Sequence, residues 1–507
     1  MSASSGAARR EGLLALTPLA VEALALRRGA SGTRVVRTGA GRHRSERAGR
    51  AHAHVQGDAV AVAGVAGALD PALRPGDLVV ATEVRGPDRT VSCPSAGILA
   101  AALRRAGVRP ALGPIVSVDR IVRGSDRDAL GSTGALAVDM ESAWLAEAAA
   151  GRPLAVVRAI VDTPNRPLTR PLATAAGGVR ALRTLSRTGP ALEAWARAAG
   201  ERTVLLAAPR SFCAGVERAI DVVERALQRF GPPVYVRKQI VHNVHVVRDL
   251  ERRGAVFVDS LQSIPEGSVV VFSAHGVSPE VRSDARDRRL HVIDATCPLV
   301  TKVHTEARRF ARSGYTIFLI GHEGHEEVEG TTGEAPGSVR LIARPEDAEV
   351  IEPKDPGRVA YLTQTTLAVD EVNGVVDELR RRFPALAGPG SDDICYATQN
   401  RQDAVKALAG ECDLMLVIGS DNSSNSKRLV EVSEREGCPA TLIDDESGID
   451  PELLVGARTV GVTAGASAPE VLVERVVAAL AAMGPVEVRQ REIGRESMRF
   501  TLPLEVR

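Results

Sequence analysis

The chain has few cysteines, no long apolar run and almost no net charge. Six cysteines among 507 residues are too few for a disulfide-stabilised scaffold, and they indicate a reducing compartment. No apolar run approaches the roughly 20 residues that a membrane-spanning helix needs. A formal net charge of +1 gives no support to nucleic-acid or membrane-surface binding as the main role. These absences favour an ordinary soluble protein.

The N-terminal stretch also lacks the pattern of a secretion signal. It begins with basic residues, but Pro18 and Glu22 interrupt its apolar part. A signal peptide needs an uninterrupted apolar core followed by small residues at the cleavage site. We therefore expect a cytoplasmic protein.

The length predicts two to four domains, because 507 residues exceed a single hydrophobic core. Strand-like apolar runs alternate with helical patterns along the whole chain, which predicts an α/β fold throughout. A Gly-Pro break near residue 189 marks the end of the first half. We place a first domain at 1–198, a linker at 199–203 and a second domain at 204–507. The second domain divides into lobes at about 204–293, 294–390 and 391–485, followed by a C-terminal tail.

The first half predicts five strands and two helices, although its opening strand near residue 13 is expected to be poorly formed. The strands are Arg34–Arg37, Ala59–Val65, Asp77–Thr82, Gly113–Val118 and Ala155–Val161, and the helices are Ala96–Ala106 and Ser142–Ala150.

Two segments of the first half carry a more specific signal. In AVDMESAWLAEAA a Met-Glu pair opens a helix, and LAVVRAIVDTPN, which runs to Asn165, is a strand that reaches an aspartate. This half resembles the nucleoside phosphorylase and nucleosidase superfamily, including its hopanoid-associated members. The resemblance implies that Glu141 holds ribose hydroxyls and that Asp162 protonates the leaving purine, tasks that suit carboxyl groups. The alternative is that both residues only cap secondary-structure elements.

Three of the cysteines share one local pattern. Cys213, Cys297 and Cys395 each precede a helical pattern and follow a short apolar run: VLLAAP, HVI and, less clearly, DDI. A thiol at a helix N-terminus lies in the positive end of the helix dipole, which lowers its pKa and favours the metal-binding thiolate. Spacings of 84 and 98 residues exclude a local CxxC knuckle and suggest three similar α/β units that converge on one point. Three thiolates without a fourth suit a 4Fe-4S cluster that keeps one iron open for chemistry.

Three histidines follow apolar strands in the second half. His242, His275 and His325 end the segments QIVH, VVVFSAH and IFLIGHEGH. Loop histidines with protonatable nitrogens suit a diphosphate, and so do the hydroxyl and amide groups of NSSNSKRL at 422–429.

Nine motifs occur in order along this half. They are FCAGVERAI, YVRKQIVHN, FSAHGVS, DATCPLVTKVH, GHEGHEEVEGT, TQTTL, DDICYATQNRQ, GSDNSSNSKRL and TAGASAPE. Residues 203–506 therefore resemble the LytB-type hydroxymethylbutenyl diphosphate reductase family of the non-mevalonate isoprenoid pathway. The sequence departs from the usual pattern at Ser211, where glycine is common, and at Lys238-Gln239, where His-Glu is common.

The resemblance implies a trilobed α/β iron-sulfur reductase with a pseudo-threefold arrangement and one 4Fe-4S cluster per chain. The cluster reduces (E)-4-hydroxy-3-methylbut-2-enyl diphosphate to isopentenyl and dimethylallyl diphosphates. Glu327 donates a proton with help from Thr365, and His325 closes over the substrate. The cluster ligands are Cys213, Cys297 and Cys395, and the diphosphate ligands are His242, His275, Ser423, Ser424, Asn425 and Ser467.

The electrons must come from another protein, because the sequence holds no flavin or nicotinamide fingerprint. A ferredoxin or a flavodoxin is the implied partner. The alternative for the second half is a zinc-binding structural or regulatory protein. For the first half, the choice lies between an enzyme that cleaves a nucleoside or a ribosylated hopanoid precursor and a module without activity.

Overall fold

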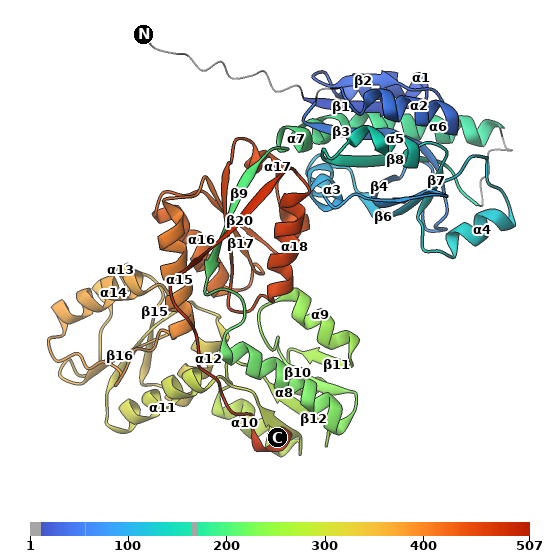
Figure 1. Ribbon diagram of the computed structural model, residues 1–507. Coiled ribbons are helices and arrows are strands. Elements are labelled where there is room, and N and C mark those ends of the chain that lie inside the picture. Colours follow the sequence, from blue (N-terminus) through green and yellow to red (C-terminus); the bar gives the residue numbers. More distant parts are fainter. Residues whose placement is uncertain (1–11, 56, 165–170) are drawn as a thin grey trace, which may run out of the picture. The chain divides into compact units, whose positions relative to one another are not determined.

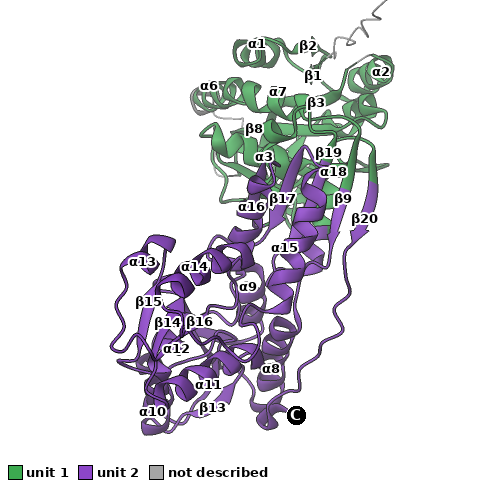
Figure 2. Ribbon diagram, turned by 90° about the vertical axis from the view of Figure 1, so that its left-hand side faces the viewer, with its two compact units in different colours: residues 1–204, 445–459, 474–487 green, residues 205–444, 460–473, 488–507 purple. Residues whose placement is uncertain are grey.

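The computed structural model describes residues 12–55, 57–164 and 171–507, which form two compact units (Figures 1 and 2). Unit 1 comprises residues 1–204, 445–459 and 474–487, and unit 2 comprises 205–444, 460–473 and 488–507. The basic N-terminal start and Asn165 lie outside the described residues. No helix of the described ranges is long and apolar enough to cross a membrane. The predicted domain limits at residues 198 and 204 stay predictions.

A mixed eight-stranded sheet forms the centre of unit 1. Its hydrogen-bonded order is β2-β1-β3-β7-β6-β4-β5, and β8 pairs with both β3 and β4. The strands are β1 (Leu13–Thr17), β2 (Arg34–Arg37), β3 (Ala59–Ala68), β4 (Leu78–Arg85), β5 (Thr90–Ser92), β6 (Pro110–Ser117), β7 (Ala137–Asp139) and β8 (Leu154–Asp162).

Helices cover this sheet. Helix α6 packs against α1 and β8, whereas α2 packs against α5 and η1. The helices are α1 (Ala20–Gly29), α2 (Arg42–His52), α3 (Ala96–Arg105), α4 (Ser125–Gly131), α5 (Ser142–Leu145), the 3-10 helix η1 (Ala146–Ala149), α6 (Pro171–Arg187) and α7 (Gly189–Arg197).

All five strands predicted for this half are present, but the expectation about the opening strand is wrong. Strand β1 is buried along its whole length and pairs in parallel with β2 and β3. Its sequence, LLALT, does not alternate between apolar and polar residues, because a strand covered on both faces needs apolar side chains on both. The helix predicted for Ser142–Ala150 is α5 followed by η1.

The second half of the chain contains three further sheets. Their orders are β11-β10-β12-β13, β15-β14-β16 and β18-β17-β19-β9-β20, and the first two are parallel throughout. The strands are β9 (Arg202–Ala208), β10 (Val234–Arg237), β11 (Ala255–Val258), β12 (Val269–Phe272), β13 (His291–Asp294), β14 (Thr316–Ile320), β15 (Val339–Ile342), β16 (Val359–Thr363), β17 (Leu414–Ile418), β18 (Ala440–Ile443), β19 (Thr459–Ala464) and β20 (Val486–Glu492).

Helices connect these parallel strands, as crossover connections require. They are α8 (Ala214–Phe230), α9 (Val244–Arg252), η2 (Leu261–Ser263), α10 (Pro279–Asp287), α11 (Pro298–Arg312), α12 (Glu326–Glu334), α13 (Pro345–Val350), α14 (Val369–Arg382), α15 (Tyr396–Ala409), α16 (Ser424–Arg435), η3 (Glu446–Gly448), α17 (Pro451–Leu454), α18 (Glu470–Ala481) and η4 (Leu504–Val506).

One local expectation for this half is wrong. The DDI segment before Cys395 is not a strand; instead, the Cys395 N–H donates to the carbonyl of Thr365, which follows β16. Strand β9 lies in one sheet with β19 and β20, although it is far from both in the sequence. Strand order across a sheet depends on long-range pairing, which the local sequence pattern does not encode.

The predicted site residues of the second half lie in loops that follow the carboxyl ends of strands. The segments with His242, His275, His325 and Thr365 follow the carboxyl ends of β10, β12, β14 and β16. The segments with Cys213, Cys297, Ser423 and Ser467 follow β9, β13, β17 and β19. Ligands of parallel α/β sheets bind beyond these carboxyl ends, so the topology itself positions a site.

Candidate functional sites

One cavity of unit 2 collects every residue that the sequence predicted for the second half. Its volume is about 100 Å³. The predicted residues in its lining are Cys213, His242, His275, Cys297, His325, Glu327, Thr365, Cys395, Ser423, Ser424, Asn425 and Ser467. Residues that are up to 254 positions apart in the sequence (213 to 467) therefore share one surface.

The three cysteines of this cavity are the residues immediately before helices α8, α11 and α15. A Cβ atom added to Gly215 would lie 2.8 Å from the Cys297 Sγ and 3.8 Å from the Cys213 Sγ. The glycine thus leaves open the space beside these two sulfurs. The Cys395 Sγ accepts a hydrogen bond from the Thr398 backbone at 3.3 Å.

The expectation of lowered thiol pKa values is wrong for the protein without metal. Burial raises the pKa of Cys297 to about 12 and that of Cys395 to about 11, although N–H groups of the helix N-termini oppose the shift. Burial raises the pKa of Cys213 as well. A bound cation reverses this balance, because it replaces the thiol protons. Three soft sulfur donors around a space kept open by a glycine fit an iron-sulfur cluster held by three ligands.

The three histidines of the same cavity lie close together. The rings of His242 and His275 are stacked, with centroids 4.1 Å apart and planes inclined by 18°. The His325 ring stands edge-on to both, with centroids 6.0 Å away. Burial lowers the pKa of His242 to about 3 and also lowers the pKa of His325. These two rings are therefore neutral at pH 7.

Glu327 and Thr365 form a buried pair at the cavity. The Thr365 hydroxyl is 3.0 Å from each carboxylate oxygen of Glu327, and the Thr365 backbone N–H donates to the same group at 3.0 Å. The Glu327 backbone N–H donates to the His325 Nδ1 at 3.2 Å. Since this nitrogen accepts, the neutral ring carries its proton on Nε2. The loop thus fixes a carboxyl group, a hydroxyl group and an imidazole N–H side by side.

Polar groups of the loops after β17 and β19 complete the cavity. The Asn425 Nδ2 and Oδ1 are buried, and neither has a hydrogen-bond partner among the described residues. Buried amide atoms without partners are costly, so such a side chain is built for a polar ligand. The Ser467 hydroxyl donates to the His242 carbonyl at 3.0 Å, which joins the loop after β19 to the loop after β10.

The sequence analysis missed Glu326, whose carboxylate lies 3.4 Å from the His275 Nδ1. Charge spacing gave no signal for it, because three of the first four residues of α12 are glutamates. The departures at Lys238 and Gln239 also lie near this site. Lys238 pairs with Glu329 at 3.2 Å, and Gln239 accepts from Asn422, which in turn contacts the His242 Nδ1 at 3.3 Å.

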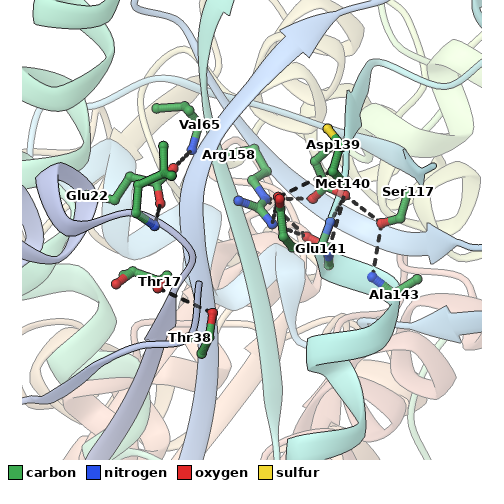
Figure 3. Close-up of polar contacts among 12 residues, drawn as sticks. Thr17, Glu22, Thr38, Val65, Ser117, Asp139, Met140, Glu141, Ala143 and Arg158 are labelled. Atoms are coloured by element: carbon green, nitrogen blue, oxygen red, sulfur yellow. Dashed lines mark hydrogen bonds and ion pairs between the residues drawn. The ribbon is translucent and has the colours of Figure 1, made fainter. Parts of the chain in front are cut away.

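A second cavity of about 310 Å³ lies in unit 1, and both Glu141 and Asp162 line it. Figure 3 shows Glu22, Asp139 and Glu141 around Arg158 in this region. The Glu141 Oε1 accepts the Gly41 N–H at 3.1 Å, so the glycine turn after β2 holds this carboxylate. Burial raises the pKa of Glu141 and of Glu22 against the opposing charge of Arg158.

Arg158 is fully buried at the centre of these carboxylates. Its Nε lies 2.7 Å from the Asp139 Oδ2, and its Nη2 lies 3.8 Å from the Glu141 Oε2. Neither Arg158 nor Glu22 was predicted from the sequence as a site residue. The sequence did contain a sign of the arginine's role, because Arg158 interrupts the apolar run AVVRAIV. A cation buried in such a strand requires nearby carboxylates.

Asp162 has an unexpected partner. The Arg127 Nη1 donates to the Asp162 Oδ2 at 2.6 Å, and the Arg127 Nε donates to the Ala68 carbonyl at 2.8 Å. Both charged side chains are almost fully buried. Burial raises the pKa of Asp162, and the arginine opposes that rise.

Two family models match the chain. The model described as LytB protein matches residues 204–481, and the model described as Phosphorylase superfamily matches residues 29–183. This chain is 61% identical to the 4-hydroxy-3-methylbut-2-enyl diphosphate reductase of Acidothermus cellulolyticus and 60% identical to that of Leifsonia xyli. Each match covers 61% of this chain, and it covers 91% of the first relative and 92% of the second. The solved structure of the E-1-hydroxy-2-methyl-but-2-enyl-4-diphosphate reductase from Plasmodium falciparum matches with a TM-score of 0.58 and 37% identity, over 61% of this chain and 97% of that chain.

Three sheets of parallel strands and a cavity with three thiols and three imidazoles define an α/β protein with a buried site of metal-binding and anion-binding groups. The LytB model covers more than half of the sequence, and the chain belongs to the LytB protein family. Its N-terminal half carries a domain of the phosphorylase superfamily.

Proposed function

We propose that this protein reduces (E)-4-hydroxy-3-methylbut-2-enyl diphosphate to isopentenyl and dimethylallyl diphosphates. The observation that carries the proposal is the single cavity lined by three thiols, three imidazoles and one buried carboxylate. The similarity to the two reductases over more than nine tenths of their length supports it. The reaction consumes two electrons and two protons and releases one water, so the site must supply a proton, hold a diphosphate and receive electrons.

Cys213, Cys297 and Cys395 would hold a 4Fe-4S cluster. When bound, the cluster supplies the electrons and a Lewis-acidic iron beside the hydroxyl group that leaves. An external donor of the ferredoxin or flavodoxin type delivers the electrons. The apolar contacts of Val241, Val300 and Phe500 with the cavity keep bulk water away from the reacting carbon.

Glu327 delivers the proton that turns the leaving hydroxyl into water. Glu327 is 5% exposed, and the Thr365 backbone N–H and hydroxyl both donate to its carboxylate. Both residues line the cavity. When Glu327 is protonated, the threonine hydroxyl relays the proton: its oxygen accepts the carboxyl proton, and its own hydrogen passes to the leaving hydroxyl group. His325, with its proton on Nε2, is an adjacent donor.

The diphosphate binds among His242, His275, Ser423, Ser424, Asn425 and Ser467. The unpartnered amide of Asn425 and the N-terminus of α16 are donors suited to a phosphate oxygen. Binding at this end holds the hydroxyl-bearing end of the substrate toward the thiols and Glu327.

The test is an anaerobic preparation of the full chain, with iron, sulfide and zinc analysis, absorption and EPR spectra, and an assay with the diphosphate substrate. We expect near four irons per chain, loss of the spectrum in Cys395→Ser, and both isomeric products. A colourless protein that contains zinc and cannot be reconstituted with iron would support the structural zinc protein instead.

A second activity is favoured by the carboxylates of unit 1. Asp139 and Glu141 pair with Arg158, and Asp162 pairs with Arg127, so carboxylates already engage both buried arginines that could otherwise bind a phosphate nucleophile, which favours water. We propose that this unit hydrolyses an N-ribosidic bond, with Glu141 on the ribose hydroxyls and Asp162 as the acid for the leaving base.

Release of base from adenosine-type nucleosides, with and without phosphate, tests this activity. We expect release that does not depend on phosphate and is lost in Asp162→Asn. No turnover of any nucleoside would support a module without activity, and strict dependence on phosphate would support a phosphorylase.

A further inference from the structure

Glu326 holds the ring of His275 from a rigid position. It is the first residue of α12, and its Oε2 lies 3.4 Å from the His275 Nδ1. The Ser273 hydroxyl donates to the same oxygen at 3.1 Å. Both side chains of the ion pair are largely buried, at 13% and 12% exposure. A carboxylate in the first turn of a helix is also stabilised by the helix dipole.

The protonation state of His275 differs from that of the other two histidines of the cavity. Burial disfavours a charged Glu326, but the proximity of His275 outweighs burial and lowers the pKa of this carboxyl to about 2. Burial likewise disfavours a charged His275, but Glu326 outweighs it and raises the pKa of the ring. His242, stacked on His275, is neutral. The remaining charged or titratable groups that face His275 are Lys238, His325 and Glu327.

We propose that Glu326 is a positioning residue for the diphosphate site, which orients His275 and keeps it an imidazolium, so that one of the two stacked rings presents a cation to the substrate. The inference rests on the proposed reductase function of the same cavity. Its physical basis is that a charge-assisted hydrogen bond to phosphate is stronger than a neutral one. The two ring nitrogens of His275 then have different partners: the Nδ1–H faces Glu326, and the Nε2–H is left to bind a ligand.

Glu326→Gln keeps the shape of the side chain and removes its charge. At pH 8 the His275 ring of the variant is neutral, and we expect KM for the diphosphate substrate to rise about tenfold, with kcat within about twofold. Burial lowers the pKa of a ring that lacks this partner, as it does for His242, so the variant ring stays neutral and the ratio of variant to wild-type KM should stay high from pH 8 down to pH 6. A KM that the substitution leaves unchanged, or a loss confined to kcat, would overturn the proposal.

Two further variants separate the ion pair from charge and stability. Glu329→Gln removes one charge from the same helix. Because Glu329 pairs with Lys238 and not with His275, this variant should change KM less than about twofold. Glu326→Asp keeps the charge and should restore part of the affinity. Should Glu326→Gln unfold at a much lower temperature than the wild type, the comparison of Glu326→Asp with Glu329→Gln still decides the question.

Binding of inorganic diphosphate tests the inference without turnover. Calorimetry of the anaerobic holoprotein in two buffers of different ionisation enthalpy measures the protons taken up on binding. At pH 7.5 we expect Glu326→Gln to take up close to one more proton than the wild type, because its His275 becomes charged only in the complex. Equal proton uptake by the variant and the wild type would contradict the role of Glu326. Extra uptake by the variant, in a protein that does not reduce the substrate, would support the ion pair but reject the reductase function.

Discussion

The guanidinium of Arg401 donates to the backbone carbonyl of Ser211 at 2.6 Å and 3.1 Å. Arg401 lies on the helix that follows Cys395, and Ser211 lies in the loop that leads into Cys213. The same guanidinium donates to the Ala397 carbonyl and pairs with Glu496 of the C-terminal tail, at 2.9 Å each. The side chain of Arg401 has no exposed surface. One buried cation therefore fixes two of the three thiol-bearing segments relative to each other.

We expect Arg401→Gln to destabilise unit 2 by about 3 kcal/mol, because the change removes the buried cation that pairs with Glu496 and that donates to several carbonyl groups. Iron should also be lost faster on exposure to air. Urea unfolding of the metal-free protein and iron retention of the holoprotein measure the two effects. Arg495→Gln is the control, because Arg495 is 88% exposed and should cost under about 0.5 kcal/mol. Equal effects of both changes would contradict the role of Arg401.

Thr365→Val should lower kcat and leave KM nearly unchanged. The change removes the hydroxyl that donates to Glu327 and relays its proton, and general acid catalysis contributes about a hundredfold or more. We expect kcat to fall between about ten- and a hundredfold in the steady-state assay. Thr366→Val is the matched variant, because the Thr366 hydroxyl donates to Ser424 at 3.2 Å and should affect KM instead. A kcat unchanged in Thr365→Val would remove the hydroxyl from the proton path.

The stability of unit 1 should fall as the pH rises. Burial raises the pKa of Glu22 above its unfolded value, so the folded state binds a proton that the unfolded state releases. The sign follows from linkage: the contribution is fully present below the unfolded pKa of about 4.3 and is lost as the pH rises through the folded pKa. Glu22→Gln cannot ionise, so it should flatten this slope.

Both tryptophans, Trp144 and Trp195, lie in unit 1, so fluorescence reports its unfolding. The measurement is the urea midpoint of the wild type and of Glu22→Gln at several pH values from 4.5 to 8. Parallel curves for the two proteins would show that Glu22 carries no coupled proton.

Arg127 should set the pH range over which unit 1 releases a base. It opposes the rise of the Asp162 pKa, so in Arg127→Gln the acid stays protonated to a higher pH. We expect the alkaline limb of the pH profile of base release to move to higher pH. Arg120→Gln, which alters a largely exposed arginine at the same cavity, should leave the limb in place. A downward shift would contradict the acid role of Asp162.

The local sequence pattern predicted most elements, and the residues predicted for the second half all line one cavity of unit 2. The apolar run before His275 is β12, and the run before His325 is β14, so both loops were placed at strand ends before any tertiary contact was known. Segments whose backbone partners are distant were harder to predict. The residues before Cys395 look strand-like, but they form no strand, and the Cys395 N–H bonds to Thr365 in the loop after β16.

Charged residues that act through buried pairs were missed for a different reason. Glu22 and Glu326 stand in helical patterns where a glutamate normally faces solvent, and only the tertiary structure brings Arg158 or His275 against them. The prediction of lowered thiol pKa values was wrong for a related reason. A helix N-terminus is visible in the sequence, but the burial that opposes it depends on three segments that close over the same cavity.

Helices α8, α11 and α15 each begin directly after one of the three cysteines. Their N-terminal ends carry partial positive charges that meet at one buried point, where water screens them weakly. A redox centre held there would gain negative charge on accepting an electron, and the three dipoles would stabilise that added charge. Its reduction potential would therefore be higher than the same three thiolates would give in flexible loops, and a weaker reductant would suffice to deliver the first electron.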